Sequence, residues 1–294
     1  MEYRIALAQT APRLGDIDAN LSMASDAVRR AAVEGAALTV LPELALTGYL
    51  LQDLVPDVAM RANDPCLAEL ANDARGMLVA IGFVEETDDH RYCNSAALVR
   101  DGEVIGIHRK VYLPTYGLFD EGRFTRPGDR IRTHDAGAPI GRIGLSVCED
   151  LWHASLPMLQ ALDGASLLVN LAAGPSRAPG GSAGLAAIAG WHKMQDTYAL
   201  LGTVPIAFCN RVGNEEGLTF WGGSRLIAAD GSTVVQAPLW EEALVVGSLD
   251  TDDLRIQRYG LPLLADERLE LVRRELDRII GERAGIDGAE WPQR

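Results

Sequence analysis

The sequence has few cysteines, and neither they nor the histidines are grouped as a metal site requires. Its four cysteines, Cys66, Cys93, Cys148 and Cys209, lie far apart and form no Cys-x-x-Cys pair. Its five histidines show no His-x-x-x-His or His-Glu-x-x-His spacing. These patterns argue against a disulfide-stapled scaffold and against a zinc site. We therefore expect a protein that uses neither a metal nor another cofactor.

The chain also lacks basic charge and long apolar runs. Its 27 basic and 41 acidic residues give a formal net charge of −14. Such an acidic surface disfavours binding to nucleic acid or to an anionic membrane. No apolar run reaches the roughly 18 residues that a membrane helix needs, and the N-terminus lacks the pattern of a signal peptide. We expect a cytoplasmic location, in reducing conditions.

No linker, internal repeat or change in composition divides the 294 residues, of which 48% are hydrophobic. Short β-branched apolar segments alternate with segments of helical periodicity, which is typical of one α/β domain. We expect that domain to span residues 1–284, with a disordered tail at 285–294. Long strand-free segments inside a compact domain are often functional, and residues 113–128 form such a loop.

The expected elements follow from apolar periodicity and from Gly, Pro and Asp-Gly breaks. Strands are expected at residues 4–9, 38–41, 77–85, 92–100, 103–110, 142–147, 166–171, 206–210, 224–228 and 243–249. Helices are expected at residues 19–34, 65–75, 151–162, 184–200 and 266–283. Residues 212–223 are expected to form a loop between two strands.

Three expected strands end at a polar residue that has no evident structural purpose. Glu43 follows the second strand, Lys110 follows the strand that starts at 103, and Cys148 follows the strand at 142–147. The ends of strands in one sheet can converge on one pocket. A cysteine nucleophile needs a general base and a group that stabilises negative charge, and these residues supply all three. Taken singly, each also fits a structural role.

Cys148 is expected at a turn between a buried strand and a helix N-terminus. There, unpaired backbone N–H groups and the positive end of the helix dipole favour a thiolate. A buried structural cysteine is the alternative interpretation.

Several motifs carry a family resemblance that covers nearly the whole chain in order. They are ALAQ at 6–9, LPELALTGY at 41–49, RKVYLP at 109–114, CEDLW at 148–152, NRVG at 210–213 and FWGGS at 220–224. Together they resemble the Glu–Lys–Cys signatures of the nitrilase, or carbon–nitrogen hydrolase, superfamily. YGLFDE at 116–121 and CEDLW are most similar to the amidase domain of glutamine-dependent NAD synthetase.

The resemblance implies a fold and a set of roles. The fold would be an α-β-β-α sandwich with a single domain, assembled as a homodimer or a larger homo-oligomer. Cys148 would attack the carbon of a small-molecule amide, with Glu43 as general base. Lys110 and the backbone N–H of Glu149 would hold the oxyanion. Glu121 would orient the site and assist proton transfer, and ammonia would leave.

The resemblance also places Tyr49, Tyr116 and Trp152 in the substrate pocket. One segment departs from the NAD synthetase pattern, because Gly174 stands where that branch has a serine that grips glutamine. The only nearby cation, Arg177, is out of register. A buried amino-acid end needs charged partners. Either Arg177 provides one or the substrate is not glutamine, and we expect glutamine to be a poor substrate.

Other functions stay open at this point. The sequence shows no ATP-pyrophosphatase segment and no P-loop, so the chain could be a separate glutaminase subunit that serves a synthetase partner. An N-carbamoyl hydrolase, a nitrilase or an inactive binding scaffold are further alternatives; the intact catalytic residues argue against the scaffold. Residues 180–184 match Gly-x-Ser-x-Gly, but the preceding loop is unlike a nucleophile elbow.

Overall fold

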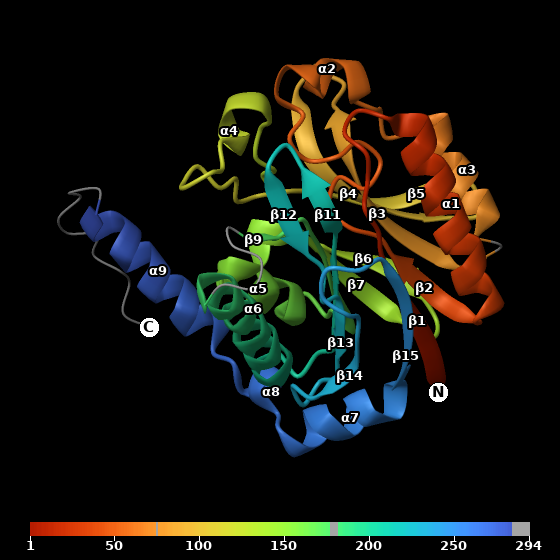
Figure 1. The fold of residues 1–294 in the computed structure, drawn as a ribbon. Helices are drawn as coiled ribbons and strands as arrows, with labels where there is room; N and C mark the ends of the chain where they lie inside the picture. Colours follow the sequence, from red (N-terminus) through yellow and green to blue (C-terminus); the bar gives the residue numbers. More distant parts are fainter. Residues whose placement is uncertain (75, 177–181, 284–294) are drawn as a thin grey trace.

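The computed structural model describes residues 1–74, 76–176 and 182–283. Two six-stranded β-sheets face each other, and helices cover their outer faces (Figure 1). The first sheet runs in the order β15 (Ala243–Asp250), β1 (Glu2–Gln9), β2 (Ala36–Val40), β3 (Leu78–Glu86), β4 (Tyr92–Arg100), β5 (Glu103–Arg109). The second runs β14 (Thr233–Gln236), β13 (Arg225–Ile227), β10 (Ile206–Asn210), β8 (Leu167–Ala172), β7 (Gly141–Val147), β6 (Thr133–Gly137). This is the expected α-β-β-α arrangement.

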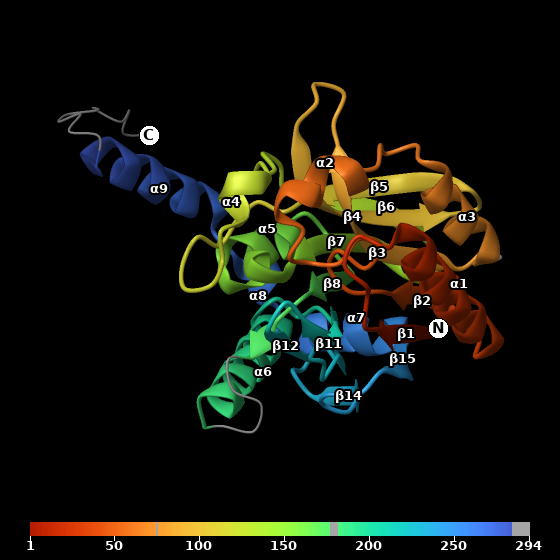
Figure 2. The same cartoon turned by 45° about the horizontal axis from the view of Figure 1, so that its top comes forward.

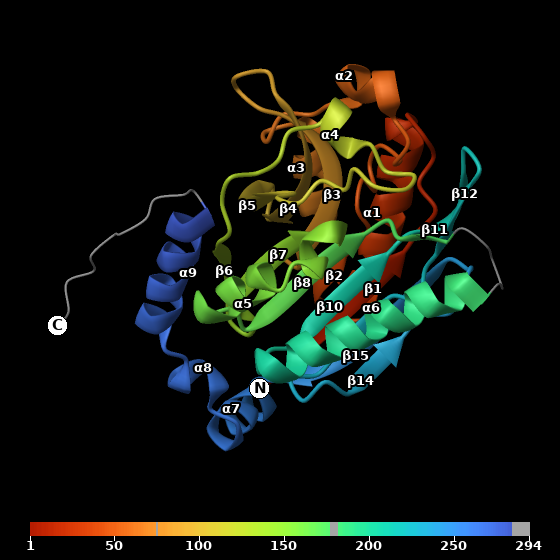
Figure 3. The ribbon, with the colours of Figure 1, turned by 90° about the vertical axis from the view of Figure 1, so that its left-hand side faces the viewer.

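The helices form two outer layers and a C-terminal extension. The layer on the first sheet consists of α1 (Ile17–Val33) and α3 (Pro65–Asp73), and the layer on the second consists of α5 (Ser155–Leu162) and α6 (Ser182–Leu201). Short helices lie in loops: η1 (Gln52–Leu54), α2 (Val55–Val58), α4 (Glu121–Phe124) and η2 (Cys148–Trp152). The chain continues through α7 (Thr251–Gly260), α8 (Leu263–Asp266) and α9 (Leu269–Arg283), of which α9 extends away from the sheets (Figure 3).

Strand β3 shows why the sequence makes this layered core. Leu78 and Ala80 pack between the two sheets, whereas Val79 and Ile81 pack against the α1 and α3 layer. Successive side chains of a strand point to opposite faces, so a strand that is buried on both faces reads as a continuous apolar run. Strand β2 is parallel to both of its neighbours, β1 and β3, and β7 is parallel to β8. Polar residues follow the ends of β2 and β7 in loops.

The structure corrects three expected element boundaries. Residues 212–223 are mostly a hairpin of β11 (Val212–Glu215) and β12 (Leu218–Trp221), which pairs with the short β9 (Pro175–Ser176). Its turn residues, Glu216 and Gly217, both have positive φ, which is the conformation of a tight hairpin turn. The expected loop was therefore wrong in this part, although the Glu-Gly pair at the tip is a signal for a turn.

The other two corrections concern helices. The helix expected at 151–162 is split, because His153 takes an extended backbone between η2 and α5. The C-terminal helix begins at Leu269 rather than at Asp266, because Glu267 is extended after α8. Helix α7, which Asp250 caps by accepting the N–H of Asp252, was not expected.

The tail at 285–294 and Arg177 lie outside the described residues. Among the described helices, none combines the length and apolar character that crossing a lipid bilayer demands.

Candidate active site

Glu43 and Lys110 meet between the sheets, as predicted from the ends of their strands. Glu43 lies three residues after β2, and Lys110 follows β5 directly. Lys110 Nζ donates to Glu43 Oε1 at 2.8 Å, and neither side chain is exposed to solvent. A buried charge is costly unless it is paired, so this fully buried ion pair has a geometry that the surrounding structure must enforce.

Glu121 completes the ion-pair cluster. It begins α4 in the long loop 113–128, and its Oε1 accepts Lys110 Nζ at 2.8 Å and the hydroxyl of Tyr49 at 2.6 Å. One ammonium therefore lies between two carboxylates. The expectation that the long loop is functional thus has a structural basis.

Glu43 is held by two further donors that the sequence reading missed. Asn94, on β4, donates from Nδ2 to Glu43 Oε1 at 2.7 Å. The backbone N–H of Ala173, after β8, donates to Glu43 Oε2 at 2.7 Å. Asn94 is a polar residue within a buried apolar strand, which is the one sequence signal that pointed to it.

Cys148 lies at the junction of β7 and η2, next to this cluster. Its backbone has φ of 45°, the left-handed region that non-glycine residues rarely adopt, and its relative exposure is 8%. Strained backbone of this kind is held in place by surrounding contacts and is concentrated at functional sites. The charges of Glu43, Lys110 and Glu121 all act on its thiol.

The thiol is not the thiolate that the sequence suggested. Burial, and then the charge of Glu43, raise the pKa of Cys148 well above its usual value, although Lys110 and the N–H of Ala173 oppose this. The expected helix N-terminus is a five-residue 3₁₀ turn, which offers only a weak dipole. This direction favours the protonated thiol, which needs a base to become a nucleophile.

Burial and neighbouring charge act against each other at Lys110 and at Glu121, and the pKa of both groups is raised. Burial lowers the pKa of Lys110, but the charges of Glu121 and Glu43 outweigh it and hold that pKa well above its usual value. Burial raises the pKa of Glu121, and Lys110 opposes the rise. Lys110 therefore keeps its charge, whereas Glu121 binds a proton more readily than an exposed glutamate does.

The three aromatic residues expected in the substrate pocket occupy different positions. Tyr49 is half-buried, and its hydroxyl donates to Glu121. Tyr116 is 59% exposed and donates to both carboxylate oxygens of Glu149, at 2.9 and 3.1 Å. Trp152 is 43% exposed and packs edge-on against Trp191 of α6. Tyr116 thus binds the residue that follows the nucleophile, whereas Tyr49 contacts the catalytic cluster through Glu121.

Gly174 lies one residue beyond the Ala173 N–H that contacts Glu43. Its own N–H donates to Asn210 Oδ1 at 2.8 Å. A Cβ at this position would approach Trp221 Nε1 at 2.9 Å, closer than real side chains pack. Trp221 Nε1 is buried and finds no hydrogen-bond partner among the residues that the structure describes. The indole of Trp221 thus takes the space that a side chain at 174 would need.

A small cavity lies behind the catalytic cluster. Its volume is about 220 Å³, and Tyr49, Asn94 and Glu121 contribute to its wall. The η1–α2 segment and α4, which lie close to each other (Figure 2), contribute further residues to its wall.

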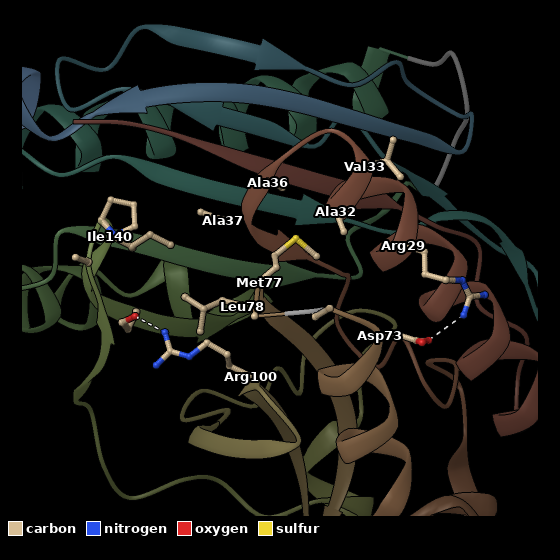
Figure 4. Close-up of a pocket in the computed structure, with 15 residues that line it drawn as sticks. Arg29, Ala32, Val33, Ala36, Ala37, Asp73, Met77, Leu78, Arg100 and Ile140 are labelled. Atoms are coloured by element: carbon tan, nitrogen blue, oxygen red, sulfur yellow. Dashed lines mark hydrogen bonds and ion pairs between the residues drawn. The ribbon is translucent and has the colours of Figure 1, made fainter.

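A larger cavity of about 680 Å³ lies elsewhere, among α1, α3 and the β6–β7 turn (Figure 4). In that cavity Arg29 pairs with Asp73, and Arg100 donates to the carbonyl of Ala136. None of the catalytic residues lines it. Within the described ranges, no group of three or more acidic, His or Cys residues is arranged to hold a metal ion.

The chain is similar to several known proteins. Residues 4–259 match the family model described as carbon-nitrogen hydrolase. Glutamine-dependent NAD(+) synthetase of Thermotoga maritima is 36% identical over 259 residues, which cover 85% of this chain and 42% of that protein. N-carbamoylputrescine amidase of Arabidopsis thaliana is 28% identical over 273 residues, which cover 88% of this chain and 90% of that protein.

The solved structure of an amidase from Nesterenkonia sp. matches with a TM-score of 0.74 and 27% identity, covering 92% of this chain and 95% of that one. The chain spans about half, or less, of the length of the NAD synthetases that it matches. Because the family model covers most of its residues, the chain belongs to the carbon–nitrogen hydrolase family.

Proposed function

We propose that the protein hydrolyses the C–N bond of a small-molecule amide through a thioester on Cys148, with release of ammonia. The observation that carries the proposal is the ion pair of Lys110 with Glu43 and Glu121, whose charges act on the thiol of Cys148. Each side chain of this cluster matches one requirement of acyl transfer to a cysteine.

In the acylation half, Glu43 takes the proton of the Cys148 thiol as Sγ attacks the amide carbon. The carbonyl oxygen becomes an oxyanion, which Lys110 Nζ and the backbone N–H of Glu149 stabilise. Protonated Glu43 returns its proton to the amide nitrogen, the C–N bond breaks, and ammonia leaves. The high pKa of Lys110 keeps the ammonium charged throughout these steps.

In the deacylation half, a water molecule attacks the thioester carbon and gives a proton to Glu43. A second oxyanion forms in the same place and collapses. The C–S bond breaks, the carboxylic acid is released, and the proton returns to Sγ. Glu121 assists by holding Lys110 in position through their hydrogen bond and by taking up or releasing a proton.

The surroundings of Gly174 support a substrate other than glutamine. A serine at this position would need Trp221 to move, so the grip expected for an amino-acid end is sterically disfavoured here. Tyr116 and Trp152, next to Cys148, offer contacts for an uncharged or partly aromatic acyl group. The similarity to N-carbamoylputrescine amidase makes carbamoyl compounds further candidate substrates. Nitriles are a third class to be tested.

A second candidate function is a glutaminase that supplies ammonia to a separate synthetase partner. It is favoured by the similarity to NAD synthetases, of which this chain matches less than two thirds. The homo-oligomer and the cytoplasmic location expected from the sequence stay predictions.

The test is ammonia release by the purified protein from a panel of amides, carbamoyl compounds and nitriles. We expect turnover of at least one amide and its loss in Cys148→Ser. Wild-type turnover by that variant contradicts the mechanism. Turnover that requires an added synthetase favours the second candidate, and a nitrile as the one good substrate contradicts the amidase assignment.

A further inference from the structure

Asp150, two residues after the nucleophile, accepts four hydrogen bonds although its side chain is completely buried. Its Oδ1 accepts the backbone N–H groups of Val111 and Tyr112, each at 2.9 Å. Its Oδ2 accepts the backbone N–H of Val147 at 2.9 Å and lies 2.8 Å from His108 Nε2. Each oxygen of the carboxylate thus has two partners.

The three backbone donors to Asp150 lie next to two different catalytic residues, which follow different strands. Val147 directly precedes Cys148, whereas Val111 and Tyr112 directly follow Lys110. The bonds to 111 and 112 span 39 and 38 residues of sequence, so they are tertiary contacts and not a local turn. One carboxylate thus joins the backbone beside the nucleophile to the backbone beside the ammonium.

This bridge has a specific consequence for an oxyanion site. In the proposed mechanism one oxyanion donor is Lys110 Nζ and the other is the N–H of Glu149, and each is anchored within two residues of a donor to Asp150. Such donors stabilise a transition state only when they are fixed before the reaction, and displacement of about 1 Å costs on the order of 100-fold in rate.

Asp150 also supports the unusual backbone of the nucleophile. Cys148 has a positive φ, and the bond from Val147 N–H to Asp150 Oδ2 closes the chain around it. His108, itself 3% exposed, holds the same oxygen from the far side. The carboxylate is therefore fixed by its partners and can transmit a fixed geometry to both segments.

We propose that Asp150 is a positioning residue that sets the distance between the two oxyanion donors, with His108 orienting its carboxylate. The proposal rests on the thioester mechanism above. It predicts that loss of Asp150 impairs reactions that pass through an oxyanion, while the intrinsic reactivity of the Cys148 thiol is kept.

Two reagents that attack the same sulfur separate these effects. With 4-nitrophenyl acetate, Sγ bonds to the acetyl carbon through an oxyanion, and 4-nitrophenolate leaves. With methyl methanethiosulfonate, Sγ forms an S–S bond, the S–SO₂ bond breaks, and methanesulfinate leaves without any oxyanion. Modification at Cys148 is followed by peptide mass spectrometry, which separates it from modification of the other cysteines.

We expect Asp150→Asn to slow acetyl transfer about 100-fold, because the amide NH₂ faces N–H donors and cannot accept from them. Its rate with methyl methanethiosulfonate should stay within about threefold of wild type. The matched control is Asp163→Asn, another aspartate that accepts a backbone N–H, that of Thr133 at the start of β6. Both rates of that control should equal those of wild type.

Equal loss of both rates in Asp150→Asn, or no loss of either, overturns the positioning role. If Asp150→Asn does not fold, as judged by thermal unfolding, His108→Gln decides instead. It withdraws one of the four contacts and should slow acetyl transfer severalfold with an unchanged methanethiosulfonate rate; unchanged acetyl transfer overturns the proposal. A wild-type protein that forms no acetyl adduct at Cys148 refutes the thioester mechanism itself, a distinct result.

Discussion

Lys110 Nζ lies 2.8 Å from Glu43 Oε1, and both side chains are fully excluded from solvent. Glu121 lies at the same distance on another side of the ammonium. Two buried carboxylates are therefore compensated by one cation. Removal of any member of this cluster has consequences both for stability and for the nucleophile.

Lys110→Met should be the most damaging substitution for stability among the catalytic residues. It leaves Glu43 and Glu121 buried without their common cation, and breaking a buried pair in this way costs about 3–5 kcal/mol. Denaturant unfolding measures the loss. The double variant Lys110→Met with Glu43→Gln should recover part of it, and a double variant no more stable than the single one would contradict the charge argument.

Glu43→Gln should lower the pKa of the Cys148 thiol while abolishing amide turnover. After burial, the charge of Glu43 is the next largest cause that raises this pKa, so a neutral side chain there eases thiolate formation. The pH dependence of Cys148 modification by methyl methanethiosulfonate reports the pKa, and its midpoint should move to lower pH. A midpoint at or above that of wild type would contradict this effect of the Glu43 charge on the thiol.

Tyr49→Phe should reduce turnover by acting on Glu121. It removes a 2.6 Å hydrogen bond to a buried carboxylate, and bonds of that kind contribute about 1.5–3 kcal/mol. We expect the loss mainly in kcat, since the Tyr49 hydroxyl binds Glu121 directly. Tyr259→Phe, at a tyrosine that is 90% exposed, is the matched control and should behave as wild type. A change in KM alone would place Tyr49 in the substrate pocket instead.

Gly174→Ser should destabilise the protein and should not create efficient glutamine turnover. The new Cβ meets Trp221 Nε1 at 2.9 Å, and overpacking of this kind costs about 1–3 kcal/mol. Trp221→Phe in the same chain should relieve the contact, so the two substitutions should be non-additive in thermal unfolding. Additive losses, or rapid glutamine hydrolysis by Gly174→Ser, would contradict this account of the loop.

His134 should make the protein less stable in mild acid. Burial, with the neighbouring charges of His108 and Arg132, lowers the pKa of His134 to about 4. Between the unfolded pKa of about 6.5 and the folded pKa the unfolded chain binds the extra proton, so stability falls as the pH falls through this window. We expect a loss of up to about 2 kcal/mol after allowance for partial exposure. His134→Gln should lack this slope in unfolding measured between pH 7 and pH 4.

The sequence was sufficient for the parts of the site that follow strands directly. Glu43, Lys110 and Cys148 stand after apolar runs, which was enough to group them as candidates. The expectation that all three follow strands of one sheet is wrong, because β2 and β5 belong to the first sheet and β7 to the second. Asn94 and Asp150 could not be assigned their contacts in this way, because their partners lie far away in the chain and are defined by how the sheets pack. The same holds for the protonated thiol, since its burial beside Glu43 is a tertiary property. The β11–β12 hairpin was missed for a local reason, an overlooked Glu-Gly turn.

The central claim is that Cys148 carries the acyl group of the substrate. Mass spectrometry of the protein, quenched in acid during turnover of an amide that releases ammonia, tests it most directly. We predict a mass increase equal to the acyl group on the peptide that contains Cys148, and no such adduct in Cys148→Ser. Steady ammonia release by the Cys148→Ser variant at the wild-type rate would contradict the account.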